Sequence, residues 1–171
     1  MPRRVVVVVI AILLLLLWFL YRPQSGSSPL TPAERAAVNH WLECEECRAN
    51  ELPTVVAIGV RAIPTLGTTL VRGPRDARTA RLRQHLIHSY QSLAAYQTVH
   101  GLQPLIPTQA QYVERFLGNY EATYRIRSAM AVALIGGTRA QTLLAQASSL
   151  PGLRPDVRAR IVFEKDSVWH P

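Results

Sequence analysis

Lysine is almost missing from this 171-residue chain, in which Lys165 is the only lysine among nineteen basic side chains. Catalytic signatures are missing as well: the sequence has no Gly-x-Ser-x-Gly nucleophile elbow, no glycine-rich phosphate loop and no His-Glu-x-x-His zinc motif. No stretch alternates polar and apolar residues with a period of two, so strands are not expected. We therefore expect an all-α protein that is not an enzyme, with no cofactor and no small-molecule substrate.

Charged residues, glycine and proline are absent from Val5–Tyr21. The segment would form about 25 Å of helix, close to the length that crosses a bilayer. It is long for a secretory signal, and no Ala-x-Ala cleavage pattern follows it. Trp18 and Tyr21 also suit a membrane interface. We favour an uncleaved anchor in the lipid bilayer. A signal that is cleaved just past Gly26 or Ser28 is the main alternative.

The arginines around this segment predict its orientation. Arg3 and Arg4 precede it and only Arg22 follows closely, which favours a single-pass protein with its N-terminus in the cytoplasm. We divide the chain into an anchor at residues 1–22, a polar linker at 23–31 and an extracytoplasmic domain at 32–171. A domain of about 140 residues is long enough to build its own core.

Helix signals run through the whole domain. Thr31 can cap a first helix, with Pro32 in its first turn and Glu34 completing a capping box. We expect helices at about Pro32–Glu46, Asn50–Gly59, Ala62–Arg72, Arg75–Val99, Thr108–Leu117, Tyr120–Ile135, Arg139–Ala147 and Pro155–Glu164.

Two turns in the sequence share a pattern. Residues 58–66 read IGVRAIPTL and residues 135–143 read IGGTRAQTL. In both, we expect the glycine to close one helix in a left-handed C-cap and the alanine to let the next helix pack closely. The two Ile-Gly pairs lie 77 positions apart, close to two repeats of about 40 residues.

Residues 57–66 resemble the turn between paired helices in the HEAT-repeat family, in its bacterial, PBS-lyase-type form. Residues 125–129 (RIRSA) and 156–159 (DVRA) resemble the Asp-x-Val-Arg sequence that begins a repeat in that family. The resemblance covers about residues 50–73 and 121–165. It implies a short, irregular α-solenoid that binds partners by the shape of its surface.

The only two cysteines, Cys44 and Cys47, form a Cys-x-x-Cys motif at the end of the first predicted helix. We favour a local disulfide that fixes the turn between two helices, which an extracytoplasmic compartment permits. A zinc site that adds His40, with His85 or His88 as a fourth ligand, is a weaker alternative. Two reduced thiols are another alternative. Redox catalysis is disfavoured because the three neighbouring glutamates raise the thiol pKa by repulsion.

Basic side chains are concentrated at the start of the long predicted helix. Arg75, Arg78 and Arg81 recur at a spacing of three, and Tyr90 follows on the same helix. They are either a solvated face or a surface for an acidic partner, phosphate or lipid headgroups. No aromatic residue alternates with these arginines, which disfavours nucleic acid.

These observations favour a non-catalytic, membrane-tethered helical module that presents a surface to an unidentified protein partner at the cell envelope. We expect the partner contacts to come from the long helix, through Arg75, Arg78, Arg81 and Tyr90. A purely architectural part in a larger complex fits the same features. The alternative from another class is a small zinc- or disulfide-dependent thiol protein that uses Cys44 and Cys47.

Overall fold

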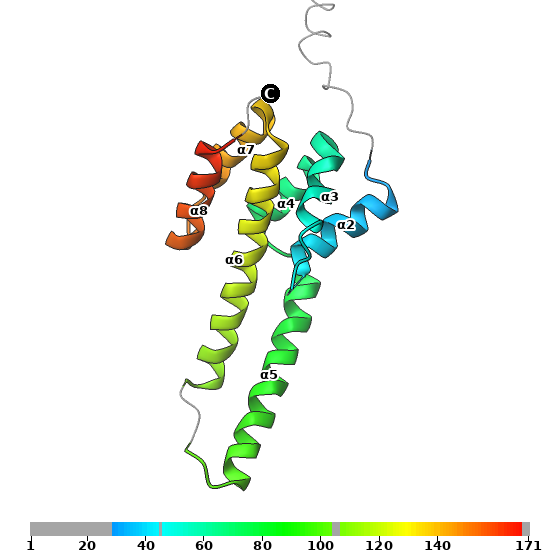
Figure 1. Cartoon of the computed structure of the whole chain (residues 1–171). Coiled ribbons are helices and arrows are strands. Elements are labelled where there is room, and N and C mark those ends of the chain that lie inside the picture. Colours follow the sequence, from blue (N-terminus) through cyan, green and yellow to red (C-terminus); the bar gives the residue numbers. More distant parts are fainter. Residues whose placement is uncertain (1–28, 45, 104–106, 169–171) are drawn as a thin grey trace, which may run out of the picture.

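The computed structural model describes residues 29–44, 46–103 and 107–168 (Figure 1). Within these residues the protein is all-helical and contains no strand, which confirms the predicted class. The predicted anchor and residues 23–28 of the linker lie outside the described residues. The helices are α2 (Pro32–Glu43), α3 (Glu51–Ile58), the 3₁₀ turn η1 (Gly59–Arg61), α4 (Ile63–Arg72), α5 (Asp76–Val99), α6 (Gln109–Ile135), α7 (Gly137–Ser148) and α8 (Pro155–Asp166).

The predicted capping box is present at the start of α2. The Glu34 amide donates to Thr31 Oγ1 at 3.2 Å, and the Thr31 amide donates to Glu34 Oε2 at 2.9 Å. The same device begins α6, where Thr108 and Gln111 exchange the equivalent bonds. Both helices therefore begin where their local sequence satisfies the first free amides.

Residues 109–135 form one helix of 27 residues, so the expectation of two helices, Thr108–Leu117 and Tyr120–Ile135, is wrong. The predicted break fell at Gly118, which lies in the helix interior. A glycine there costs only about 1 kcal/mol relative to alanine. Leu117 and Ala122 are buried on either side of it, and this packing outweighs that cost.

The glycines that end helices have positive φ, as expected, but they are not left-handed α caps. Gly59 has φ 68° and ψ −148°, and Gly136 has φ 76° and ψ −171°. Gly73, after α4, has a similar conformation. This region, with positive φ and extended ψ, is open essentially to glycine alone. Each glycine therefore ends its helix with an abrupt change of chain direction.

The core surrounds the C-terminal half of α6, with α2, α3 and α4 on one side and α7 and α8 on the other (Figure 1). Leu30 of the predicted linker is also buried there. The first half of α6 leaves this body beside α5, so the two form a long antiparallel hairpin. A second, small cluster holds the hairpin together, and its buried members are Leu86, Val113 and Leu117.

Among the described residues, no single helix is both long and apolar enough to cross a membrane. The segments Glu51–Arg61 and Ile63–Arg72 reach that length and hydropathy only as a pair, bent by 106°.

Candidate functional site

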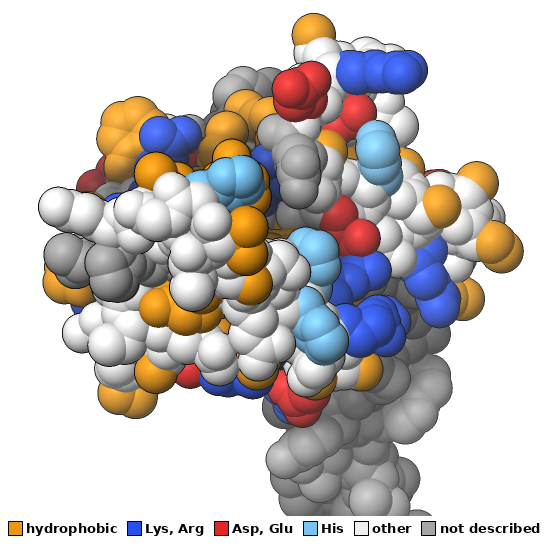
Figure 2. Space-filling view, turned by 90° about the horizontal axis from the view of Figure 1, so that it is seen from below, with side chains coloured by type: hydrophobic (Ala, Val, Ile, Leu, Met, Phe, Trp, Pro, Cys, Tyr) orange, Lys and Arg blue, Asp and Glu red, His pale blue; other side chains and the backbone are white. Residues whose placement is uncertain are grey.

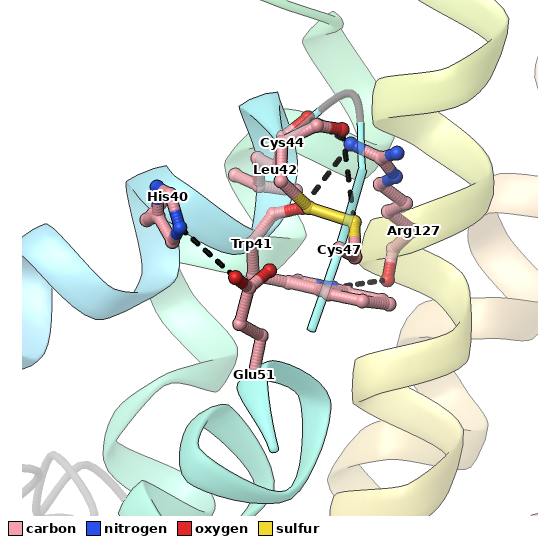
Figure 3. The surroundings of a disulfide bond; sticks show 7 residues. All are labelled: His40, Trp41, Leu42, Cys44, Cys47, Glu51 and Arg127. Carbon is pink, nitrogen blue, oxygen red and sulfur yellow. Dashed lines mark hydrogen bonds and ion pairs between the residues drawn. A yellow bond between two sulfur atoms is a disulfide. The ribbon is translucent and has the colours of Figure 1, made fainter. Parts of the chain in front are cut away.

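Cys44 and Cys47 are joined by a disulfide in the turn between α2 and α3, the arrangement that the sequence favoured (Figure 3). Their Cα atoms are 5.2 Å apart. Cys44 is the C-cap of α2, and only 8% of its surface is exposed. The disulfide therefore lies at the edge of the core, where it fixes how the chain leaves α2.

Glu51, the first residue of α3, points toward this disulfide (Figure 3). Its Oε1 lies 3.0 Å from Nε2 of His40 on α2. Because a carboxylate only accepts hydrogen bonds, Nε2 is the protonated nitrogen of this contact. The other oxygen, Oε2, is buried and has no hydrogen-bond partner among the residues that the structure describes. The Glu51 side chain is 11% exposed, whereas that of His40 is 66% exposed.

Cys44 Sγ, Cys47 Sγ and a carboxylate oxygen of Glu51 all lie within 4.8 Å of one another. Within the part of the chain that the structure describes, this is the one trio of possible metal ligands at such distances. The histidines proposed from sequence are not members of it. His40 contacts Glu51, His88 lies 2.9 Å from Gln84 Nε2, and His85 lies near Arg78 and Arg81.

Arg127 of α6 lies on the other side of the disulfide turn (Figure 3). Its Nη1 donates to the carbonyls of Trp41 and Leu42, at 3.3 and 3.1 Å. Its guanidinium also lies over the Trp41 ring, 5.6 Å from the centroid. Burial lowers the pKa of Arg127, and the Glu51 carboxylate opposes that shift. The cation therefore satisfies the last turn of α2 and contributes positive charge beside the cysteines.

The predicted partner-binding residues have different surroundings. Arg78 forms an ion pair with Glu43 and donates to Tyr124 Oη at 2.9 Å, so it connects α5 to α2 and α6. Tyr90 donates to the Pro107 carbonyl at 3.1 Å, and its ring packs against a second tyrosine of the hairpin. Arg75 and Arg81 are exposed. Arg78 and Tyr90 therefore stabilise the fold, whereas Arg75 and Arg81 are accessible.

A groove of about 1040 Å³ lies between α4 and α7. Its described lining consists of threonines, Gln146 and apolar residues, with Arg139 as the one charged residue and no carboxylate, histidine or thiol. Gly67 lines it where α4 approaches Leu143 of α7. This lining contains no side-chain pair suited to acid–base or nucleophilic chemistry.

Two arginines besides Arg127 also cap distant helix ends, a role that the sequence analysis did not assign. Arg125 donates to the carbonyls of Leu70 and Val71 at the end of α4, at 2.7 and 2.8 Å. Arg158 donates to the carbonyl of Ser148 at the end of α7 and to that of Leu150, the latter at 2.8 Å. All three arginines lie in residues 125–129 and 156–159, the two segments that resemble the start of a HEAT repeat, so the sequence carried a signal for this role.

No protein-family model, curated protein or solved structure matches the chain.

Proposed function

We propose that this protein is a non-catalytic, membrane-tethered helical module that binds a protein partner at the cell envelope. Val5–Tyr21 supplies the tether, with the N-terminus in the cytoplasm and the helical domain outside the cytoplasmic membrane. The observation that carries the proposal is the exposed surface of the outer hairpin, which we define as residues 84–103 and 107–113.

The outer hairpin has an unusual composition. From Gln84 to Val113 the chain contains no aspartate, glutamate, lysine or arginine over thirty consecutive residues. Figure 2 looks at this end of the molecule, and the nearest surface is mainly white and orange, with the larger group of basic side chains to one side. The cores of protein–protein interfaces are likewise depleted in charge. The composition therefore supports a docking role.

Large hydrophobic side chains are exposed on and beside the outer hairpin. Val99 is 79% exposed, and the others are Leu93, Tyr96, Leu102 and Phe116. Two helices alone cannot enclose a core. Among the described residues, the cluster that joins them has three buried side chains, with three partly buried ones packed against it. A partner that covered these residues would complete the packing of the hairpin. Arg75 and Arg81, exposed at its base, would add contacts to an acidic rim.

We also propose that the body is a short, irregular solenoid of the HEAT type. Two observations support this. Gly59 and Gly136, which end the helices before the two similar turns, have nearly the same backbone conformation. Arg127 and Arg158, from the two similar motifs, both donate to the carbonyls at a helix end. The chain turns by 106° between α3 and α4, which is less than in an antiparallel helix pair. The proposed solenoid is therefore irregular at this turn.

Site-directed photo-crosslinking in native membranes tests the docking role. A photoreactive residue is placed at Leu93 or Tyr96 in the full chain, and at Phe163 of α8 as the matched control, since Phe163 is also exposed. We expect the same adduct from both hairpin positions and none from α8. Reversing the charge of Arg75 and Arg81 should weaken the adduct. No adduct, or an identical one from Phe163, would reject the outer hairpin as the contact.

A further inference from the structure

We propose that reduction of the Cys44–Cys47 disulfide converts the α2–α3 corner into a Zn²⁺ site. The ligands are the two thiolates, Oε2 of Glu51 and one water molecule. His40 is not a ligand in this arrangement but holds the carboxylate through Oε1. This inference is independent of the proposed docking role.

The unpartnered oxygen of Glu51 is the central observation. A buried carboxylate oxygen without a hydrogen bond is costly, and few native groups remain in that state without a reason. This oxygen belongs to the carboxylate that has an oxygen within 4.8 Å of both sulfur atoms. A cation bound between the three groups would satisfy it. No other described residue is in a comparable position near the cysteines.

The contact with His40 strengthens the assignment. Nε2 of His40 lies 3.0 Å from Oε1, so that oxygen is already satisfied and Oε2 remains for a metal. Ligating carboxylates are commonly oriented by such an outer hydrogen bond, and its loss lowers metal affinity by about 10- to 100-fold. His40 and Glu51 come from adjacent helices, so the two helix ends hold the carboxylate in place.

Charge also balances in the metal-bound state. Two thiolates and one carboxylate carry three negative charges, and Zn²⁺ with the guanidinium of Arg127 carries three positive ones. Arg127 is close enough to Glu51 for the carboxylate to raise its pKa against the effect of burial. The site would therefore bring no net charge to the edge of the core, which is the condition for burying ions at low cost.

A dithiol reductant transfers two electrons and two protons to the disulfide: its own sulfurs form a disulfide, the Cys44–Cys47 bond breaks, and two thiols result. Binding of Zn²⁺ then releases these two protons to solvent as both thiols become thiolates. In the oxidised protein the sulfurs are uncharged and cannot hold the ion. Metal affinity therefore depends on the redox state of this pair.

Cobalt titration of the purified full chain tests the proposal. The protein is reduced with a phosphine, desalted without oxygen and titrated with Co²⁺, whose bonds to thiolate give a charge-transfer band in the near ultraviolet. We expect one Co²⁺ per reduced chain, displaced by Zn²⁺, and no band for the oxidised chain. Absence of the band after reduction, or equal binding by the oxidised chain, would overturn the proposal.

Variants separate the ligands from their neighbours. Glu51→Gln should lower Co²⁺ affinity at least tenfold, and His40→Gln by about 10- to 100-fold. Glu46→Gln is the matched control, because Glu46 lies beside Cys47 in sequence but is exposed and outside the trio. This variant should bind Co²⁺ with the affinity of wild type. Circular dichroism checks that each variant keeps its helices. A folded Glu51→Gln variant that binds Co²⁺ as tightly as wild type would exclude Glu51 as a ligand.

Discussion

Trp41 and Arg127, which are 86 positions apart, each donate a side-chain hydrogen bond to the other's backbone carbonyl. The indole Nε1 of Trp41 donates to the Arg127 carbonyl at 3.3 Å, and Nη1 of Arg127 donates to the Trp41 carbonyl at 3.3 Å. The guanidinium also lies over the indole ring. This reciprocal pair joins the end of α2 to the C-terminal half of α6, next to the disulfide (Figure 3). It sets the position of the α2–α3 corner against the core.

Replacing Arg127 should therefore destabilise the whole domain. Arg127→Ala removes two charge-assisted hydrogen bonds to helix-end carbonyls. We expect the free energy of unfolding, measured in urea, to fall by about 2 to 3 kcal/mol. Arg127→Lys should restore less than half of the lost free energy of unfolding. A lysine ammonium lacks the planar guanidinium that reaches both carbonyls and stacks on tryptophan. Arg139→Ala is the control: Arg139 is exposed, and its loss should change stability by less than about 0.5 kcal/mol.

The disulfide should make a modest contribution, because it closes a loop of only a few residues. The chain-entropy relation gives about 2 kcal/mol for a loop of this size. The free energy of unfolding of the double variant Cys44→Ser, Cys47→Ser should therefore be lower than that of wild type by about 2 kcal/mol. The comparison is made by urea unfolding under oxidising conditions with a chelator present. Reduced wild type with chelator should match the double variant. A loss near zero would mean that the Trp41–Arg127 pair alone fixes this corner.

Local sequence signals predicted much of the fold. The box of Thr31 and Glu34, the proline at the start of α2 and the Cys-x-x-Cys spacing act over three residues or fewer, so the chain shows them directly. The break expected at Gly118 failed for a non-local reason. The packing of Leu117 and Ala122 against other helices keeps that helix continuous, and no local pattern reveals such packing.

The candidate site was less accessible to sequence reasoning. Cys44, Cys47 and His40 were identified, but Glu51 was not, because an acidic residue in the first turn of a helix is ordinary. Its approach to the sulfurs depends on the angle between α2 and α3, which Arg127 of a distant helix helps to fix. A ligand set that depends on tertiary geometry in this way has no signature in sequence spacing.

The backbone conformation at Gly59 can be tested apart from side-chain packing. A Cβ atom built there meets nothing within 4 Å, so any cost of Gly59→Ala comes from its positive φ. We expect the free energy of unfolding of Gly59→Ala, measured in urea, to be lower than that of wild type by about 1 to 3 kcal/mol. Gly118→Ala is the matched control, because its Cβ would make an ordinary contact of 3.6 Å with Arg154 inside a helix. That variant should gain up to about 1 kcal/mol. Equal effects at both positions would contradict the assigned conformation.

Glu34 should give the protein part of its acid sensitivity. The backbone hydrogen bond from Thr31, followed by the side-chain hydrogen bond from Arg61, lowers the pKa of Glu34 from its ordinary value of 4.5. The folded state therefore favours the ionised carboxylate. The resulting stability is fully present above pH 4.5 and is lost as the pH falls below that value toward the lowered pKa. Glu34→Gln should be less stable than wild type at pH 7, and the difference should shrink below pH 4. A difference that stays constant from pH 7 to pH 3 would contradict this linkage.

Ser128 is fully buried in α6, and its hydroxyl has no hydrogen-bond partner within the described part of the chain. A buried hydroxyl without a partner lowers the stability of the folded state, and serine is also a weaker helix former than alanine. Ser128→Ala should therefore raise the free energy of unfolding by about 1 kcal/mol. Ser148→Ala is the control, because the Ser148 hydroxyl donates to the Ala145 carbonyl at 2.8 Å and its removal should bring no such gain. If Ser128→Ala instead destabilises the protein by 1 kcal/mol or more, then its hydroxyl binds a polar group, and the α6 core is less apolar than its lining residues indicate.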